Sequence, residues 1–141
     1  MIQQHSRPLV VLLALTLAGC SSSSPDGALK SILSDMEAMA VILEQDEASF
    51  QSSRAALGQH HKHALDTYKQ LANPKQLSYE EQQRLFERHR EETDRVAMRL
   101  LKAAVARNYS VVDLPGLGRA GIRLQESGEL QKIMKNTAKS R

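Results

Sequence analysis

An apolar residue recurs at every seventh position from residue 29 to residue 71 without a miss. The positions are Leu29, Met36, Leu43, Phe50, Leu57, Ala64 and Leu71. A seven-residue apolar repeat is typical of helices that pack along a shared seam, as in coiled coils. The pattern predicts one long helix over 28–72, or two helices in line. Gly58 lies inside it and disfavours a helix interior, so a kink or a break near residue 58 is predicted.

Local signals indicate where this helix ends and where the next one begins. Asn73-Pro74 ends the first helix, because proline disfavours helical geometry in the residue before it. Ser78 and Glu81 then have the spacing of a capping box, in which each side chain bonds the other residue's backbone N–H. A second helix is therefore predicted over 79–108.

A third and weaker apolar pattern predicts a C-terminal helix over 122–137. The predicted fold class is all-α, with a long antiparallel helical hairpin that turns at 73–77. Together with the C-terminal helix, the hairpin would form a three-helix bundle. We expect residues 28–141 to form a single helical domain.

The register of this hairpin leaves part of the first helix without a partner. With a turn at 73–77, the second helix ends level with residue 42, so residues 28–41 extend beyond it. A large apolar face that stays uncovered marks an interaction site. We expect this face to be covered by the third helix or by another chain, which would make it a surface for a protein partner or for self-association. Its residues are Leu29, Ile32, Leu33, Met36 and Met39.

The N-terminal residues have the organisation of a secretory signal peptide. Arg7 precedes a short apolar run, which ends in small residues of the kind that precede a cleavage site. The run is too short to cross a membrane, because a spanning helix needs roughly 20 apolar residues. The stretch Leu17-Ala18-Gly19-Cys20 resembles the lipobox of bacterial lipoproteins. The resemblance implies that residues 1–19 are removed, that the Cys20 sulfur carries diacylglycerol, and that a fatty acid such as palmitate acylates the new amino group.

This resemblance also implies a location for the protein. Cys20 is the only cysteine in the chain, so an exported protein of this sequence has no second thiol for a disulfide. In enterobacteria-like lipoproteins an aspartate after the cysteine retains the protein in the inner membrane, whereas this chain has Ser21. We therefore expect a lipid anchor on the periplasmic face of the outer membrane, with the inner membrane as the alternative. Residues 20–27 would be a flexible tether.

Composition and motifs exclude several classes of function. The 19 basic and 16 acidic residues leave a net charge of +3, which is too balanced for a nucleic-acid-binding protein. The glycines at 116, 118 and 121 match a dinucleotide-binding pattern, but the strand–helix–strand setting that the pattern requires is not predicted. No catalytic arrangement of side chains is recognisable. We expect no nucleic-acid partner and no enzymatic activity.

One cluster contains potential metal ligands. His60, His61 and His63 lie within one helical turn, and the hairpin register places His61 level with His89. Neutral imidazoles are ligands for zinc and copper. Lys62 within the cluster, and the lack of a second histidine motif, instead favour ordinary packing and hydrogen bonding. Two interpretations remain open: no cofactor, or a zinc or copper site formed by these four histidines.

The C-terminal segment is basic, since residues 119–141 contain six basic and two acidic side chains. Two interpretations are again open. The segment either complements the acidic first helix within the fold, or contacts an anionic surface such as lipid headgroups.

Residues 77–85 (LSYEEQQRL) are similar to the LTxxQ segments of small helical periplasmic stress proteins related to Spy and CpxP. Ser78 and Glu81 replace the threonine and glutamine of that motif, and no second copy occurs. The resemblance implies a chaperone or metal-stress role. Taken together, the sequence predicts a lipid-anchored interaction, accessory or assembly module, with a metal-responsive periplasmic sensor as the alternative.

Overall fold

The computed structural model describes residues 24–140, and every regular element within this range is an α-helix. The all-α prediction is confirmed for this part of the chain, but the helices are more numerous and paired differently than predicted. The predicted signal peptide and Cys20 lie outside the described residues. The helices are α2 (Pro25–Leu43), α3 (Glu47–Leu71), α4 (Tyr79–Arg88), α5 (Arg90–Arg107), α6 (Leu117–Glu126) and α7 (Glu129–Lys139).

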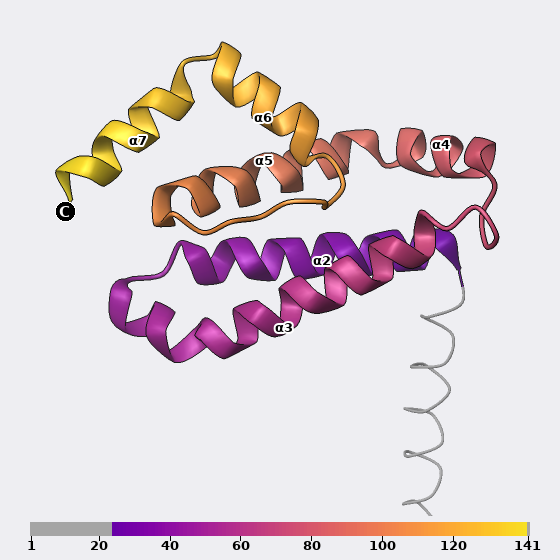
Figure 1. Cartoon of the computed structure of the whole chain (residues 1–141), viewed down its shortest axis with the longest axis horizontal. Helices are drawn as coiled ribbons and strands as arrows, with labels where there is room; N and C mark the ends of the chain where they lie inside the picture. The colour runs from indigo at the N-terminus through magenta and orange to yellow at the C-terminus, as the bar shows by residue number, and fades with distance from the viewer. Residues whose placement is uncertain (1–23, 141) are drawn as a thin grey trace, which may run out of the picture.

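The region predicted as one long helix turns back on itself at residues 44–46, so that α2 and α3 form an antiparallel pair (Figure 1). Asp46 begins α3, because its carboxylate accepts a hydrogen bond from the Ser49 backbone N–H at 2.9 Å. α3 then continues through Gly58 without a break. The predicted break at Gly58 is therefore wrong. A glycine costs a helix interior only about 1 kcal/mol, and the packing of α3 along α2 outweighs this cost.

α2 lies at the centre of the fold, with α3 on one side and α5 on the other (Figure 1). Eight of its side chains are buried. The predicted partner surface is among them, and each of its residues is at most 2 % exposed: Leu29, Ile32, Leu33, Met36 and Met39. The prediction that these residues form a surface is wrong, because α3 and α5 cover both sides of α2. The predicted register, which paired 28–72 with 79–108 across a turn at 73–77, is replaced by this arrangement.

Ion pairs attach α5 to α2 and show that the two helices run in the same direction. Arg95 Nη2 donates to Glu37 Oε1 at 3.0 Å. One turn further along α5, the Arg99 guanidinium donates to both carboxylate oxygens of Glu44, at 3.0 and 2.9 Å. These two hydrogen bonds lower the pKa of Glu44. Paired N–H donors facing paired oxygens define orientation as well as attraction, so the Arg99–Glu44 contact helps to set the register of α5 on α2.

Arg107, near the end of α5, holds the turn between α2 and α3 in place. Its guanidinium donates to the carbonyl oxygens of Leu43, at 3.0 Å, and Gln45. It also donates to the Glu47 carboxylate at 2.9 Å and lies 4.2 Å from the centre of the Phe50 ring. The end of α2 leaves carbonyl groups without a helical partner. Arg107 satisfies these groups from a distant part of the chain, so the turn needs neither glycine nor proline.

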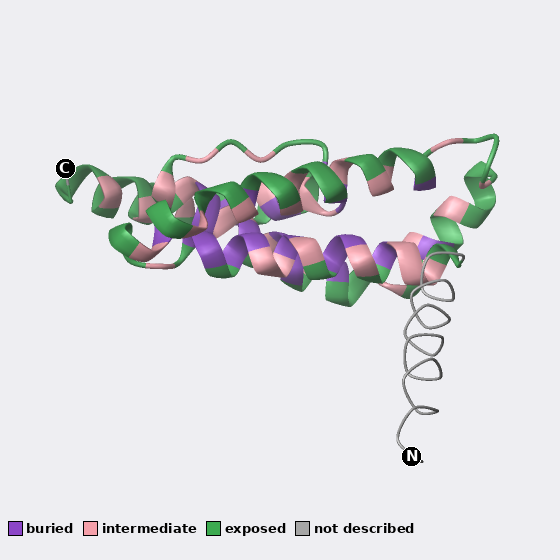
Figure 2. Cartoon of the chain, turned by 90° about the horizontal axis from the view of Figure 1, so that it is seen from below, coloured by how far each residue is buried: buried purple, intermediate pink, exposed green. Residues whose placement is uncertain are grey.

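The C-terminal part of the chain packs on α5. After α5 the chain runs back along this helix, and α6 and α7 then follow (Figure 1). The predicted third helix, 122–137, instead begins at Leu117 and is interrupted at Ser127 and Gly128. Gly128 has a φ of 76°, a left-handed conformation that glycine adopts readily. α7 has no buried residue, as Figure 2 shows.

Two arginines of the basic C-terminal segment share one acidic partner on α5, and one acidic residue of the segment pairs with a lysine of α5. Asp94 accepts from Arg119, at 2.8 Å, and lies 3.6 Å from Arg123. Lys102 contacts Glu129 at 2.7 Å. For the described residues, the interpretation that this segment complements the first helix is therefore wrong, because α5 lies between them.

Candidate functional site

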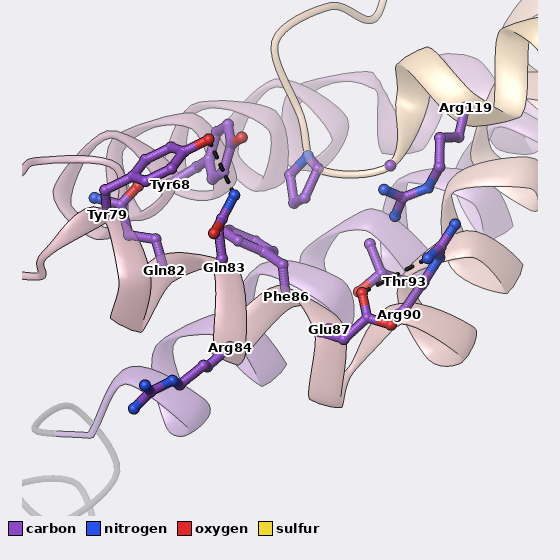
Figure 3. A pocket seen from close by; sticks show the side chains of 12 residues that line it. Tyr68, Tyr79, Gln82, Gln83, Arg84, Phe86, Glu87, Arg90, Thr93 and Arg119 are labelled. Atoms are coloured by element: carbon purple, nitrogen blue, oxygen red, sulfur yellow. Dashed lines mark hydrogen bonds and ion pairs between the residues drawn. The ribbon is translucent and has the colours of Figure 1, made fainter.

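A cleft of about 700 Å³ opens where α4 meets α5 (Figure 3). Four parts of the chain enclose it: the end of α3, the length of α4, the start of α5, and the segment 115–119. These parts are distant in sequence. The predicted continuous helix 79–108 is interrupted at His89, and this interruption gives α4 a different course from α5. The cleft lies beside the interruption.

The break between α4 and α5 is stabilised by contacts of His89 and Arg88 with Asp26, in the first turn of α2. His89 has backbone angles of φ −109° and ψ 15°, outside the helical range. Its ring nitrogen Nε2 lies 2.6 Å from Asp26 Oδ1, and Arg88 donates to the same carboxylate at 3.2 Å. The hydrogen bond from His89 is the main cause that lowers the pKa of Asp26 below its ordinary value. The chain around His89 contains no glycine or proline, so these contacts replace the usual sequence causes of a kink.

Aromatic side chains form one wall of the cleft. Phe86 packs edge-to-face on Tyr68, with ring centres 6.0 Å apart and an angle of 81° between the rings. Tyr79 is 71 % exposed, although it is a large ring, and Gln83 donates to its hydroxyl at 3.0 Å. Neighbouring Leu85 is buried and fastens α4 to the core. Rings held this way offer contact area at little entropic cost, as at protein interfaces.

The opposite wall is formed by a close approach between α5 and the residues that lead into α6. Gly116 has a φ of 81°. A Cβ at this position would lie 3.0 Å from the Ala97 Cβ and 3.0 Å from the Thr93 Cγ2. Thr93 is 1 % exposed, and its hydroxyl has no hydrogen-bond partner. The wall therefore contains one buried polar group, and the Thr93 hydroxyl has no surface open to the cleft.

Arginines give the cleft a positive charge. Arg84, Arg90 and Arg119 line it, together with the acidic residue Glu87. Arg90 reaches Glu87 only at 3.6 Å, and both side chains are exposed, so this contact is weak. In Figure 3, the guanidinium groups of Arg90 and Arg119 lie at the same end of the cleft, whereas Arg84 points away from them.

The predicted histidine cluster is divided between separate places. His60 and His63 share a helix face, as the spacing predicts, and both ring Nδ1 atoms lie against the carboxylate of Asp35 on α2, at 2.8 and 2.5 Å. His61 points elsewhere, and its Nδ1 is hydrogen-bonded to the Tyr109 hydroxyl at 3.0 Å. Burial lowers the pKa of His61.

The predicted approach of His61 to His89 is not found, since His89 contacts Asp26 instead. The reason is the pairing of helices, because α3 packs along α2 rather than along the predicted second helix. Within residues 24–140, no group of three or more His, Cys, Asp or Glu side chains is arranged to hold a metal ion.

Sequence reasoning did not identify the cleft residues as a site. One signal was present, because Tyr79, Gln83 and Phe86 follow a helical spacing that places them on one face of α4. The contact of α4 with the core buries only Leu85. The aromatic side chains on this face are therefore not explained by burial in the core. The contributions of Tyr68 and Thr93 depend on tertiary packing and have no local signal.

None of the helices in the described range is both long enough and apolar enough to cross a membrane. The predicted lipid-attachment residue Cys20 lies before that range. Comparison with protein-family models, curated proteins and solved structures finds no match to this chain.

Proposed function

We propose that this protein is a lipid-anchored, periplasmic helical module that binds a segment of a partner protein and acts by binding rather than by catalysis. The cleft beside His89 is the observation that carries the proposal. Its aromatic wall, its volume and the polar side chains that line it are typical of a recognition site. The apolar face of α2 takes no part in this proposal, because it is buried in the core.

The anchor is proposed from the lipobox resemblance at Cys20. Several acyl chains hold a protein on a membrane firmly, whereas a single chain binds reversibly. An anchored module would meet partners in or near the same membrane, and this location favours a role as an accessory or assembly factor.

Labelling with radioactive palmitate should mark the native protein when it is produced in a Gram-negative host. Cys20→Ala should abolish the label, because the sulfur that accepts the lipid is lost. Globomycin, which blocks lipoprotein signal peptidase, should cause a larger precursor to accumulate on a gel. Ser22→Ala is the matched control and should be labelled normally. An unlabelled native chain, with unchanged mobility in globomycin, would refute the anchor.

A photo-crosslinking amino acid at Gln83 should form an adduct with a partner protein in the producing cells. Gln83 lines the cleft and is exposed. The same crosslinker at Gln51, exposed on α3, is the control and should not form this adduct. Adding Phe86→Ala should remove the Gln83 adduct, because it deletes part of the aromatic wall. Equal adducts from both positions, or an adduct that survives Phe86→Ala in a folded protein, would contradict binding in the cleft.

A further inference from the structure

The charge at one end of the cleft restricts what the partner segment can be. Arg90 from α5 and Arg119 from α6 both line the cleft, and Figure 3 shows their guanidinium groups at the same end. Two like charges that meet in this way repel each other unless an anion lies between or beside them. Asp94 partly neutralises Arg119, through contacts at 2.8 and 2.9 Å. Asp94 is also shared with Arg123, so its charge is divided between two arginines.

Unused hydrogen-bond donors accompany this charge. Each guanidinium carries five N–H donors in a planar arrangement that matches a carboxylate. Arg119 directs its Nε and Nη2 groups to Asp94, and Arg90 makes one long contact of 3.6 Å with Glu87. Donors on both side chains remain for a ligand. A carboxylate placed between them would accept hydrogen bonds from two elements of the fold at once.

The aromatic wall adjoins these donors. Phe86 and Tyr68 form a rigid edge-to-face pair, and Tyr79 extends the wall into solvent. Such a surface accepts an aromatic or apolar side chain, which gains by leaving water. On the same wall, the Gln83 amide and the Tyr79 hydroxyl are exposed polar groups that can pair with a peptide N–H or C=O group.

We infer that the occupant of the cleft is an acidic segment of a partner protein, in which Asp or Glu carboxylates flank an aromatic or apolar side chain. The inference rests on the proposed function and specifies its ligand. The carboxylates contact Arg90 and Arg119, and the apolar side chain packs against Phe86. Charge complementarity selects this occupant over a basic or uncharged segment.

A selection from phage-displayed random peptides tests the inference on the purified full chain in detergent. Selected peptides should contain Asp or Glu next to an aromatic or large apolar residue. Their binding should require Phe86, and Phe86→Ala should remove it. The affinity should fall as salt is added, because partly exposed charges are screened.

The double variant Arg90→Gln/Arg119→Gln tests the charge at the site itself. Its affinity for a selected acidic peptide should fall roughly tenfold to 100-fold, the effect of losing hydrogen bonds to a charged group. The matched control is Lys132→Gln/Lys135→Gln on α7, which removes the same net charge away from the cleft and should bind normally. Circular dichroism verifies that both variants are folded.

The possible outcomes separate this inference from the proposed function. Peptides that need Phe86 but are basic or uncharged would overturn the inference and leave the proposed function standing. Acidic peptides that bind both double variants equally well would also overturn it, since net charge rather than Arg90 and Arg119 would explain the selection. If no selected peptide depends on Phe86, the proposed function fails, and the inference fails with it.

Discussion

The Met36→Ala chain should unfold with a free energy about 2–5 kcal/mol smaller than that of the native chain, the range measured when large core side chains are truncated. Met36 is 0 % exposed and lies in the middle of α2. α3 and α5 pack on opposite sides of that helix, so the cavity would be enclosed on both sides and would collapse only in part. Urea denaturation followed by far-ultraviolet circular dichroism measures the difference.

Val41→Ala is the matched control on the same helix. Val41 is 46 % exposed, so its truncation should change the free energy of unfolding by no more than about 0.5 kcal/mol. The comparison distinguishes a core from a docking surface, because truncating a side chain on an exposed face leaves stability nearly unchanged. If Met36→Ala were as stable as Val41→Ala, the central position of α2 would be refuted.

Gly116→Ala should be the second strongly destabilising change. A left-handed backbone costs a residue with a side chain about 1–3 kcal/mol, and Gly116 has a φ of 81°. The added Cβ would also lie 3.0 Å from Ala97 and from Thr93, and overpacking of this kind costs a further ~1–3 kcal/mol. The loop would have to move away from α5, which would also alter the wall of the cleft. Thermal and urea denaturation measure the loss.

Gly118→Ala, two residues further on, should not lower the free energy of unfolding. Its Cβ would meet no atom within 4 Å, and Gly118 lies inside α6. Alanine in a helix is favoured over glycine by about 0.5–1 kcal/mol, so this variant should be as stable as the native chain or more stable. Equal destabilisation by both changes would show that the close approach of residue 116 to α5 does not decide the outcome.

The histidines show why the spacing of residues in the sequence was insufficient to locate a site. The histidine spacing correctly places His60 and His63 on one face, because that relation is local to a helix. The partner of this face is Asp35 on α2, which the predicted single helix over 28–72 would place far from His60 and His63. Contacts between distant segments depend on which helices pair, and the periodicity of one helix does not identify its neighbour.

The helical class and the buried faces are properties of the sequence itself. All seven residues of the heptad pattern, from Leu29 to Leu71, are buried. The capping box at Ser78 is formed as predicted, because both of its hydrogen bonds join residues three apart. Helix propensity, capping and apolar periodicity involve residues within one or two helical turns. They can therefore be recognised in the sequence before the fold is known.

The reversal at residues 44–46, the interruption at His89 and the cleft beside it were decided by the tertiary structure. Arg107 holds the reversal and Asp26 holds the interruption, and each acts on residues about sixty positions away in the chain. These long-range hydrogen bonds, together with the packing of α2 on α3, stabilise the broken form. The pattern of apolar residues is the same in a straight and in a broken helix, so it does not distinguish between them.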